Sequence, residues 1–574
     1  MNRSVFDDPI TLEVVWGRLV TLADEMQTVL RRTAFSTVVS TGNDLGCEIM
    51  DARAWSVAHA VTSNPTFNLT LPHLTAALLE TFPAETLREG DVLFTNDPWI
   101  GAGHLPDVAV VTPFFKRGRV VGFAGSIAHV SDIGGLLNQS EARSVYEEGV
   151  YFPPLKLYDA GVRNDAVFST LRGSVRTPEL VIGDINAIVT ANSVAATHTV
   201  DLLDEYGLDD LQQLSDAVQS RAEKAMRVTI ESIPDGTYPF ELTFDELDGE
   251  LTLGVELVVS GSDLLVDYVR VPPQHPHGGI NSTLTFTTAR TTYALNCLLT
   301  PQIPSNQGLF RPVRVQAPSG SVLNPVHPAS VNDRTKVGWH VIPLVQGALA
   351  GVLPERIPAA GGFKSSLRLI GTGAHDVAVS SLAFTGGGLG AGHGGDGVDA
   401  ICYPTSSSSI PVEIYETTTG ARIGRKELAP GTAGAGRFRG GHGQVVTLRP
   451  PRAGSGLTLA AGCHQQSHPP FGLAGGLAAQ PTEARIDGIA VPVSETSARL
   501  GALPFDAGAP TVTLRTAGGG GHGSPVDRPV EAVLRDVRDE LLSVEEALDV
   551  YGVTVDLEAL TATRRTSPGG SEIP

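Results

Sequence analysis

Cysteine is scarce in this chain. Its 574 residues include four cysteines, and no two of them stand in a C-x-x-C spacing: Cys47, Cys297, Cys402 and Cys463. This scarcity argues against a disulfide framework and against a zinc site built from thiolates. Because well-separated cysteines fit a reducing compartment, we expect a cytoplasmic protein.

Export and membrane segments are also missing from the sequence. Residues 1–9 contain no basic region followed by an apolar run. No later stretch reaches the roughly eighteen uninterrupted apolar residues of a membrane-spanning helix. We therefore expect neither an export signal nor a membrane span.

Positive charge is in short supply. Lysine and arginine number 41 against 62 aspartates and glutamates, which gives a formal net charge of −21 spread along the chain. Proteins that bind nucleic acid present clustered positive charge to the phosphates. We therefore expect no nucleic-acid partner.

Two motifs of nucleotide and nucleophile chemistry are absent. The nearest approach to a phosphate-binding P-loop, residues 361–365, lacks the required Gly-Lys-Ser/Thr order. Gly-x-Ser-x-Gly does not occur, and Cys463-His464 is only a pair of chain neighbours. The sequence therefore predicts that this chain holds no ATP in a P-loop, and it gives no specific sign of covalent catalysis.

The remaining composition is that of a large folded protein. Apolar residues make up 41% of the chain and charged residues 18%, close to the average of soluble proteins. The length exceeds what one ordinary core fills, so we expect two or three packed lobes. The fold class that we predict is α+β, with mixed helical and antiparallel β-rich layers and long glycine-rich loops.

Hydrophobic spacing predicts the order of the elements. Apolar residues recur at helical spacing in four segments: 10–35, 68–83, 176–226 and 530–551. They alternate as in antiparallel strands over 236–269. Two apolar runs between residues 108 and 130, joined by the turn-like segment 116–119, predict a β-hairpin.

These patterns predict three lobes and a tail. Residues 1–230 form an N-terminal α+β lobe that carries the hairpin, and residues 231–360 form a β-rich middle lobe. Residues 361–560 form a glycine-rich C-terminal lobe with a terminal helix, and residues 561–574 form a tail. The 64 glycines concentrate after about residue 360, and the apolar residues between them favour ordered loops over disorder.

The pattern His-x-x-Asp occurs twice, once where the first strand of the hairpin begins and once where the second strand ends. His104 and Asp107 precede the first strand, and His129 and Asp132 end the second. A hairpin returns its second strand to the start of the first, so two imidazoles and several carboxylates converge there, with Asp97 close by in sequence.

Such a group suits a divalent ion bound by nitrogen and oxygen, namely Mn, Zn or Fe. Three protein ligands leave an open position for catalysis, and we predict His104, Asp107 and His129 as those ligands. Asp97 and Asp132 are further ligands, outer hydrogen-bond acceptors or carriers of protons. The alternative is that all five are polar loop residues that cap turns.

Other histidines and one basic loop are weaker candidates. His275 and His277 lie near Asn281, but loop histidines are more often structural than substrate-binding. The basic, glycine-rich segment 437–443 fits an anion site, although a structural loop is the preferred interpretation.

The segments around these motifs resemble the hydantoinase B family. That family includes the B-type components of N-methylhydantoinase and oxoprolinase-type enzymes and is related to the larger subunits of acetone and acetophenone carboxylases. The resemblance covers nearly the whole chain and is carried, in order, by residues 30–36, 96–107, 128–135, 148–149, 183–184, 411–413, 434–441 and 518–523.

The resemblance implies a hydantoinase A-type partner with an actin-like ATPase fold that phosphorylates a substrate carbonyl. This chain then completes the reaction at its metal site, ATP is bound by the partner, and the two form a hetero-oligomer. The family's metal ligands map by motif onto His104, Asp107 and His129, and Asp97 matches the Asn-Asp-Pro motif.

The chain departs from the family pattern at two places. The usual Gly-Gly-Thr-His reads Gly-Ala-Gly-His at residues 101–104, which is a conservative change. A His-Pro-x-His stretch expected near residue 65 reads Ser-Asn-Pro-Thr-Phe-Asn at residues 63–68. Because the second change removes histidines from the pocket, the resemblance implies a substrate class and not a compound.

Three functions follow from this resemblance. The leading hypothesis is ATP-dependent hydrolysis of a cyclic amide or imide, with Asp97 or Asp132 handling protons. The second is carboxylation of a ketone-like substrate, which requires bicarbonate. The third is a scaffold that docks the ATPase partner without a working metal site.

Overall fold

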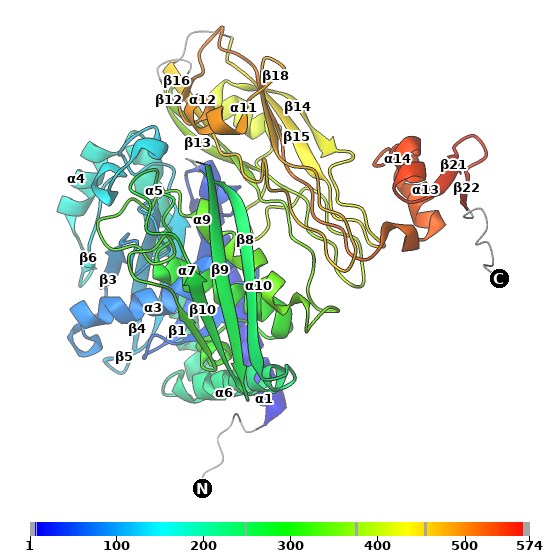
Figure 1. Ribbon diagram of the computed structural model, residues 1–574. Helices are drawn as coiled ribbons and strands as arrows, with labels where there is room; N and C mark the ends of the chain where they lie inside the picture. Colours follow the sequence, from blue (N-terminus) through cyan, green and yellow to red (C-terminus); the bar gives the residue numbers. More distant parts are fainter. Residues whose placement is uncertain (1–5, 7, 247–248, 374–376, 453–455, 566–574) are drawn as a thin grey trace.

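The computed structural model describes the chain except residues 1–5, 7, 247–248, 374–376, 453–455 and 566–574 (Figure 1). Within these described residues, helices combine with five sheets, four of which pair their strands entirely antiparallel. The fifth is antiparallel except for one parallel pair. The predicted α+β class is confirmed.

A seven-stranded antiparallel sheet forms the N-terminal part, in the order β2-β1-β5-β4-β3-β6-β7. Its strands are β1 (Leu45–Asp51), β2 (Ser56–His59), β3 (Val92–Thr95), β4 (Asp107–Lys116), β5 (Arg119–His129), β6 (Leu155–Asp159) and β7 (Val162–Arg163). The accompanying helices are α1 (Pro9–Thr33), α2 (Thr37–Ser40), α3 (Pro65–Thr81), α4 (Asp165–Ser174) and α5 (Pro178–Glu205).

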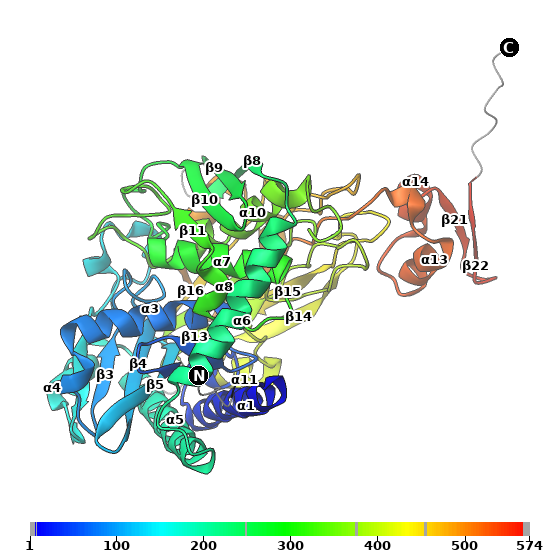
Figure 2. The same cartoon turned by 90° about the horizontal axis from the view of Figure 1, so that it is seen from below.

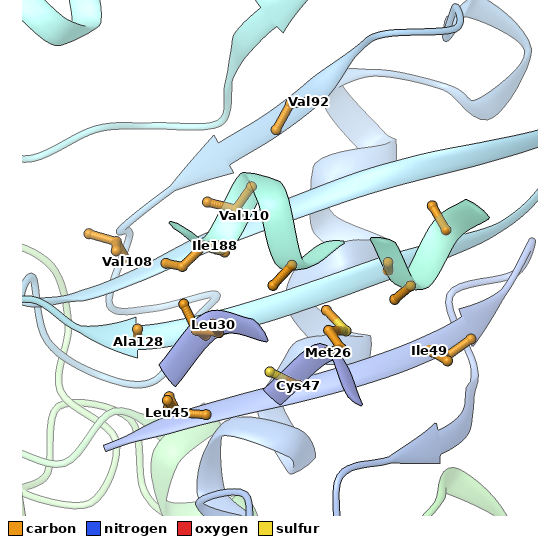
Figure 3. Packing of buried hydrophobic residues seen from close by; sticks show 14 of the residues in the cluster. Met26, Leu30, Leu45, Cys47, Ile49, Val92, Val108, Val110, Ala128 and Ile188 are labelled. Carbon is orange, nitrogen blue, oxygen red and sulfur yellow. The ribbon is translucent and has the colours of Figure 1, made fainter. Parts of the chain in front are cut away.

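Helices cover both faces of this sheet. Seen from below, α1 and α5 lie on one side of the strands and α3 on the other (Figure 2). Along β4 the buried side chains alternate, since Val108 and Val110 belong to the core under α1 and α5 while Ala109 and Val111 belong to the core under α3. Figure 3 shows the first core, where Met26 and Leu30 from α1 and Ile188 from α5 meet the strands.

Local sequence explains why α1 begins where it does. Asp8 accepts hydrogen bonds from the backbone amides of Ile10 and Thr11 at 3.4 and 3.0 Å, and Pro9 occupies the first helical position. The helix predicted over residues 10–35 is confirmed to within two residues at its C-terminal end.

The predicted hairpin is β4 and β5. Arg117 and Gly118 connect them with φ values of 51° and 75°, as expected for a two-residue turn whose twist matches that of the strands. The register pairs Asp107 with His129 at the far end. The hairpin therefore brings the two ends of the motif together.

The long helix α5 has the length and composition of a membrane span, and it is the helix of the described chain that passes this test. Its side chains at Val181, Ile185, Ile188 and Ala191 are buried in the first core. The helix packs against β4 and β5, which explains its apolar character.

The middle part contains a four-stranded sheet in the order β11-β10-β9-β8. Its strands are β8 (Gly236–Glu246), β9 (Gly249–Ser260), β10 (Asp263–Arg270) and β11 (Val313–Gln316), the last parallel to β10. The sheet packs with α6 (Gln212–Glu231), α7 (Leu284–Leu299), α8 (Gln307–Phe310) and α10 (Val341–Ala350), and α9 (Thr335–Gly338) packs against α7. The antiparallel strands predicted over 236–269 are confirmed.

Two further sheets share a core in the C-terminal part. One has the order β13-β12-β16-β19 and the other β14-β15-β20-β17-β18. The elements are β12 (Ser365–Thr372), β13 (Ala378–Thr385), α11 (Val412–Thr419), β14 (Arg422–Ala429), β15 (Gly443–Arg449), β16 (Gly456–Ala461), β17 (Glu483–Ile486), β18 (Ile489–Ala490), α12 (Val493–Leu500), β19 (Leu503–Pro504) and β20 (Val512–Arg515).

Glycine-rich segments pack side by side next to these sheets. We call the segments 386–392, 433–441 and 517–523 the glycine bundle. Their backbones are hydrogen-bonded to one another, for example from Gly434 to Gly519 and from Gly519 to Gly441, at 2.8 and 2.9 Å. A Cβ atom on Gly440 would lie 1.8 Å from the carbonyl oxygen of Gly519. Glycine is therefore required by close backbone approach.

The chain ends in a small unit that lies beyond the glycine bundle, far from the N-terminal sheet (Figures 1 and 2). It contains α13 (Val530–Arg538), α14 (Val544–Asp549), β21 (Val553–Asp556) and β22 (Thr561–Arg564), with its own small core. The tail predicted from residue 561 is wrong at its start, because residues 561–564 pair with β21. Residues 566–574 lie outside the described residues, and the predicted lobe boundaries stay predictions.

Candidate metal centre

The end of the hairpin brings together three side chains from separate positions. Asp107 is the first residue of β4, His129 is the last residue of β5, and His104 lies in the loop that leads into β4. His104 and Asp107 are buried, and His129 is nearly so. These are the three residues that the sequence predicts as metal ligands.

The three atoms that could bind a metal ion form a small triangle. His104 Nε2 lies 2.8 Å from Asp107 Oδ1, His129 Nδ1 lies 3.0 Å from the same oxygen, and the two nitrogens are 3.2 Å apart. Bonds of about 2.1 Å to one ion at right angles would separate ligand atoms by about 3 Å. The triangle therefore matches one face of an octahedral coordination sphere.

His104 is held in the tautomer that a metal ligand needs. Its Nδ1 lies 2.8 Å from the carbonyl oxygen of Asn332, so Nδ1–H donates there and the lone pair of Nε2 points into the triangle. Burial, together with the charge of Arg334, lowers the pKa of His104 to about 4. The imidazole is therefore neutral at physiological pH.

A buried carboxyl group supports that carbonyl. Glu148 Oε1 accepts hydrogen bonds from the backbone amides of Val331 and Asn332 at 2.7 and 2.8 Å. Burial raises the pKa of Glu148 to about 8, so the group is mostly protonated at neutral pH. It fixes the peptide segment whose carbonyl orients His104.

Arg334 contacts one of the two carboxylate oxygens of Asp107. Its guanidinium lies 2.5 Å from Asp107 Oδ2, and its Nε donates to the carbonyl of Ala102 at the same distance. Burial alone would raise the pKa of Asp107, but His104 and Arg334 outweigh it and hold the pKa far below its usual value. The carboxylate stays charged, with Oδ1 directed at the triangle.

The structure keeps Asp97 and Asp132 apart from the triangle. Asp97 accepts hydrogen bonds from the amide of Trp99 at 2.8 Å and from the hydroxyl of Tyr151 at 2.7 Å. Asp132 is fully buried and forms an ion pair with Arg176 at 2.8 Å. Neither is among the described residues that line the neighbouring cavity. Both carboxylates instead fix loops that flank the hairpin end.

A cavity of about 240 Å³ opens beside the triangle. All three main parts of the chain contribute to its wall. The N-terminal part supplies the triangle and Phe67, the middle part supplies α7 and residues 332–339, and the C-terminal part supplies β12 and the segment 460–466. Apolar rings from Phe286, Trp339 and Phe384 line it beside several charged groups. Its size and mixed lining suit a small organic molecule.

Sequence reasoning missed several of these wall residues. Arg290, Arg334 and Lys364 carry no motif, and each reaches the cavity from a distant part of the chain. Lys364 lies within the segment 361–365, which resembles a P-loop only in composition. The weaker candidates lie elsewhere: His275 Nδ1 contacts the carbonyl of His277 at 2.7 Å, outside the cavity wall.

The comparison with protein families gives one decisive match. A model described as Hydantoinase B/oxoprolinase matches residues 8–525. The chain belongs to this family. The resemblance seen in the motifs is therefore confirmed, and the hydantoinase B/oxoprolinase match covers all three parts of the molecule that wall the cavity.

Two proteins of this kind are similar to the chain over nearly their full length. The chain is 31% identical over 573 residues to the B component of a putative D-/L-hydantoinase from Pseudomonas sp. (strain NS671), covering 96% of this chain and 95% of that protein. The crystal structure of the ATP-dependent caprolactamase from Pseudomonas jessenii superposes with a TM-score of 0.84 at 28% identity, covering 96% of this chain and 97% of that chain.

A nucleotide-free structure of acetone carboxylase has the same fold. It superposes with a TM-score of 0.81 at 18% identity, covering 96% of this chain and 80% of that chain. At this identity the likeness shows the fold alone. The architecture of this hydantoinase B/oxoprolinase chain is thus shared by proteins whose names indicate different reactions.

Proposed function

We propose that this chain is the metal-bearing, B-type component of an ATP-dependent hydrolase of cyclic amides or imides, working beside an ATPase of the hydantoinase A type. Family membership supports this proposal, as do a relative named as the B component of a hydantoinase and a structural neighbour named ATP-dependent caprolactamase. The observation that carries it is the triangle of His104 Nε2, Asp107 Oδ1 and His129 Nδ1 at the wall of a small-molecule cavity.

The donor set decides which ions fit. Two imidazole nitrogens and one carboxylate oxygen suit Mn, Zn or Fe, and no thiolate lies among the three ligands. When bound, such an ion polarises a carbonyl or lowers the pKa of a water molecule. Asn332 and Arg334 fix the ligands that would hold it.

The cavity wall supplies the rest of the reaction's needs. Phe286, Trp339 and Phe384 offer apolar surface to a ring and exclude bulk water from it. Starting from the substrate phosphorylated on its carbonyl oxygen, one water adds across the carbon–nitrogen bond, with its oxygen on the carbonyl carbon and its protons on the leaving nitrogen. A second water then cleaves the resulting acyl phosphate to the carboxylate and inorganic phosphate. Because Asp97 and Asp132 are engaged elsewhere, we assign them to positioning of the loops and not to this proton transfer.

The ATPase partner explains how the chain uses ATP. The sequence contains no P-loop, so the proposal assigns nucleotide binding and activation of the substrate carbonyl to the hydantoinase A-type partner. The two chains form a hetero-oligomer in this proposal, and a cytoplasmic location stays a prediction.

The test is elemental analysis combined with an assay of the complex. The chain is purified with its A-type partner as wild type, as His104→Ala and as the control His198→Ala, whose imidazole is exposed and pairs with Glu25. Hydantoin, 5-oxoproline and caprolactam serve as probes, and ADP and ring-opened product are measured with and without bicarbonate.

Each outcome selects one function. Bound metal and bicarbonate-independent ring opening in the wild type and in the control, both lost in His104→Ala, support the hydrolase. A requirement for bicarbonate and a new carbon–carbon bond would point to a carboxylase. A chain without metal that still binds its partner would leave only the scaffold.

A further inference from the structure

Several buried cations line the cavity, and some have an evident partner. Arg334 pairs with Asp107 at the metal ligands, and Lys336 pairs with Asp333 at 3.0 Å. Arg290 and Lys364 differ from these. Among the residues that the structure describes, neither forms an ion pair with a carboxylate, although both line the same cavity.

Arg290 lies on α7 with 2% of its surface exposed. Its NH1 donates to the carbonyl of Pro404 at 3.1 Å, and its guanidinium lies 4.9 Å from the ring of Phe286. Its Nε has no hydrogen-bond partner among the described residues. Burial lowers the pKa of Arg290 to about 9, and the charge of Arg334 acts in the same direction. A buried donor without a partner is costly, so the site calls for an acceptor.

Lys364 approaches the same space from the segment that precedes β12, with 5% of its surface exposed. Its ammonium donates to Ser407 Oγ at 2.9 Å and lies 3.5 Å from the ring centroid of Phe384. Burial lowers the pKa of Lys364, and the charges of Arg290 and Arg334 add to that effect. The amine therefore has one neutral oxygen partner and spare donors.

One acidic residue is close enough to affect both cations. The charge of Asp44 acts on Arg290 and Lys364, but Asp44 forms an ion pair with neither, and one of its oxygens accepts from Asn64 Nδ2 at 3.0 Å. The other carboxylates of the cavity wall act on other groups: Asp107 pairs with Arg334, Asp245 with His468 and Asp333 with Lys336, and the charge of Glu246 acts on Lys336. The cavity is built to receive an anion.

The donors favour a phosphoryl group over a carboxylate. A guanidinium and an ammonium together present more N–H groups than the two oxygens of a carboxylate easily accept. A phosphoryl group carries nearly two negative charges and three acceptor oxygens, enough to engage both cations. A carboxylate would neutralise one cation and leave the other dependent on Asp44.

We propose that Arg290 and Lys364 form a phosphoryl subsite in the metal cavity, which holds the phosphorylated substrate delivered by the partner and the inorganic phosphate left after reaction. The inference rests on the proposed function, since it assumes a substrate activated by phosphorylation. The subsite places the phosphoryl oxygens beside Arg290 and Lys364, which line the same cavity as the metal ligands.

The test uses inorganic phosphate as the probe and the intact complex as the protein. Lys364→Met keeps the length of the side chain and removes its charge, and Arg290→Gln removes the second cation. The matched controls are Lys224→Met, on the exposed side of α6, and Arg270→Gln, whose side chain is 67% exposed. Product inhibition by phosphate, ADP release, ring-opened product, metal content and thermal unfolding are measured for each.

We expect the two cavity variants to keep their metal and to weaken phosphate inhibition by about 10- to 100-fold, as loss of a charged hydrogen bond does. ADP release continues while ring-opened product falls, because activation takes place on the partner. Lys364→Met also unfolds at a temperature equal to or above that of the wild type, since a buried unpaired ammonium is removed. Lys364→Arg restores part of the inhibition.

Two results would overturn the inference while leaving the proposed function standing. One is unchanged phosphate inhibition in both cavity variants of an active, metal-containing complex. The other is stronger competition by acetate than by phosphate, which would assign the cations to a substrate carboxylate. A wild-type complex without metal or ring opening would instead refute the proposed function itself.

Discussion

Glu148 makes a prediction about pH that can be worked out in full. Its carboxyl group accepts two backbone amides through Oε1, while Oε2 is buried without a partner among the described residues. The pKa rises from 4.5 to about 8 because burial disfavours the charged form. We therefore replace it by glutamine, which keeps the accepting oxygen and cannot titrate.

The sign follows from the raised pKa. The folded state binds the proton more tightly than the unfolded state, so the stabilising contribution is complete below about pH 4.5 and is lost as the pH rises through about 8. The two values differ by about 3.5, and each pKa unit corresponds to about 1.4 kcal/mol, which gives an upper limit of about 5 kcal/mol. Glu148→Gln should show no such loss.

Amide hydrogen exchange of the segment 331–334 measures this local stability directly, because two of its amides bond to Glu148. Wild type, Glu148→Gln and the exposed control Glu231→Gln are compared between pH 5 and 9 after correction for intrinsic exchange rates. Opening free energies that fall with pH in the wild type and in the control, but not in Glu148→Gln, support the reasoning. Parallel curves for all three proteins would refute it.

Three further predictions concern the ligands and the glycine bundle. His129→Ala loses the bound metal but keeps its fold, whereas the control His198→Ala keeps both. Elemental analysis measures the metal and circular dichroism the fold. Metal retained in His129→Ala would show that the assignment is wrong. Arg334→Met removes the cation that pairs with the buried carboxylate of Asp107 and destabilises the metal-free protein by about 3–5 kcal/mol. Added metal recovers more stability in this variant than in the wild type. Gly440→Ala lowers stability by at least about 1–3 kcal/mol because its Cβ meets a carbonyl oxygen, while Gly394→Ala, which points into open space, leaves the unfolding temperature unchanged.

The sequence predicts the hairpin end well because the information there is local. Two apolar runs and a turn place Asp107 opposite His129, and the preceding loop brings in His104. The same spacing also predicts that Asp132 lies beside these three residues, but the structure places it elsewhere. The second strand ends at His129, and the chain then turns so that Asp132 meets Arg176, which follows more than forty residues later. Spacing alone carries no information about that partner.

The other half of the cavity could not be predicted for the same physical reason. Arg290, Arg334 and Lys364 line the cavity only because the middle and C-terminal parts pack against the hairpin. Along the chain Lys364 is one lysine beside two glycines, in a segment without the Gly-Lys-Ser/Thr order of a P-loop. Its burial against Phe384, on which the proposed anion site depends, arises from tertiary contact.

The glycine bundle has a consequence for how the protein responds to temperature. Its segments are joined by backbone hydrogen bonds, and their contacts are between peptide groups with few apolar side chains. Exposure of apolar surface raises the heat capacity of unfolding and exposure of peptide groups lowers it. Unfolding of the bundle should therefore add less heat capacity per residue than unfolding of the sheets, and its stability curve should be flatter. The C-terminal unit would then stay attached to the rest of the molecule over a wider range of temperature than a hydrophobic interface of the same size would allow.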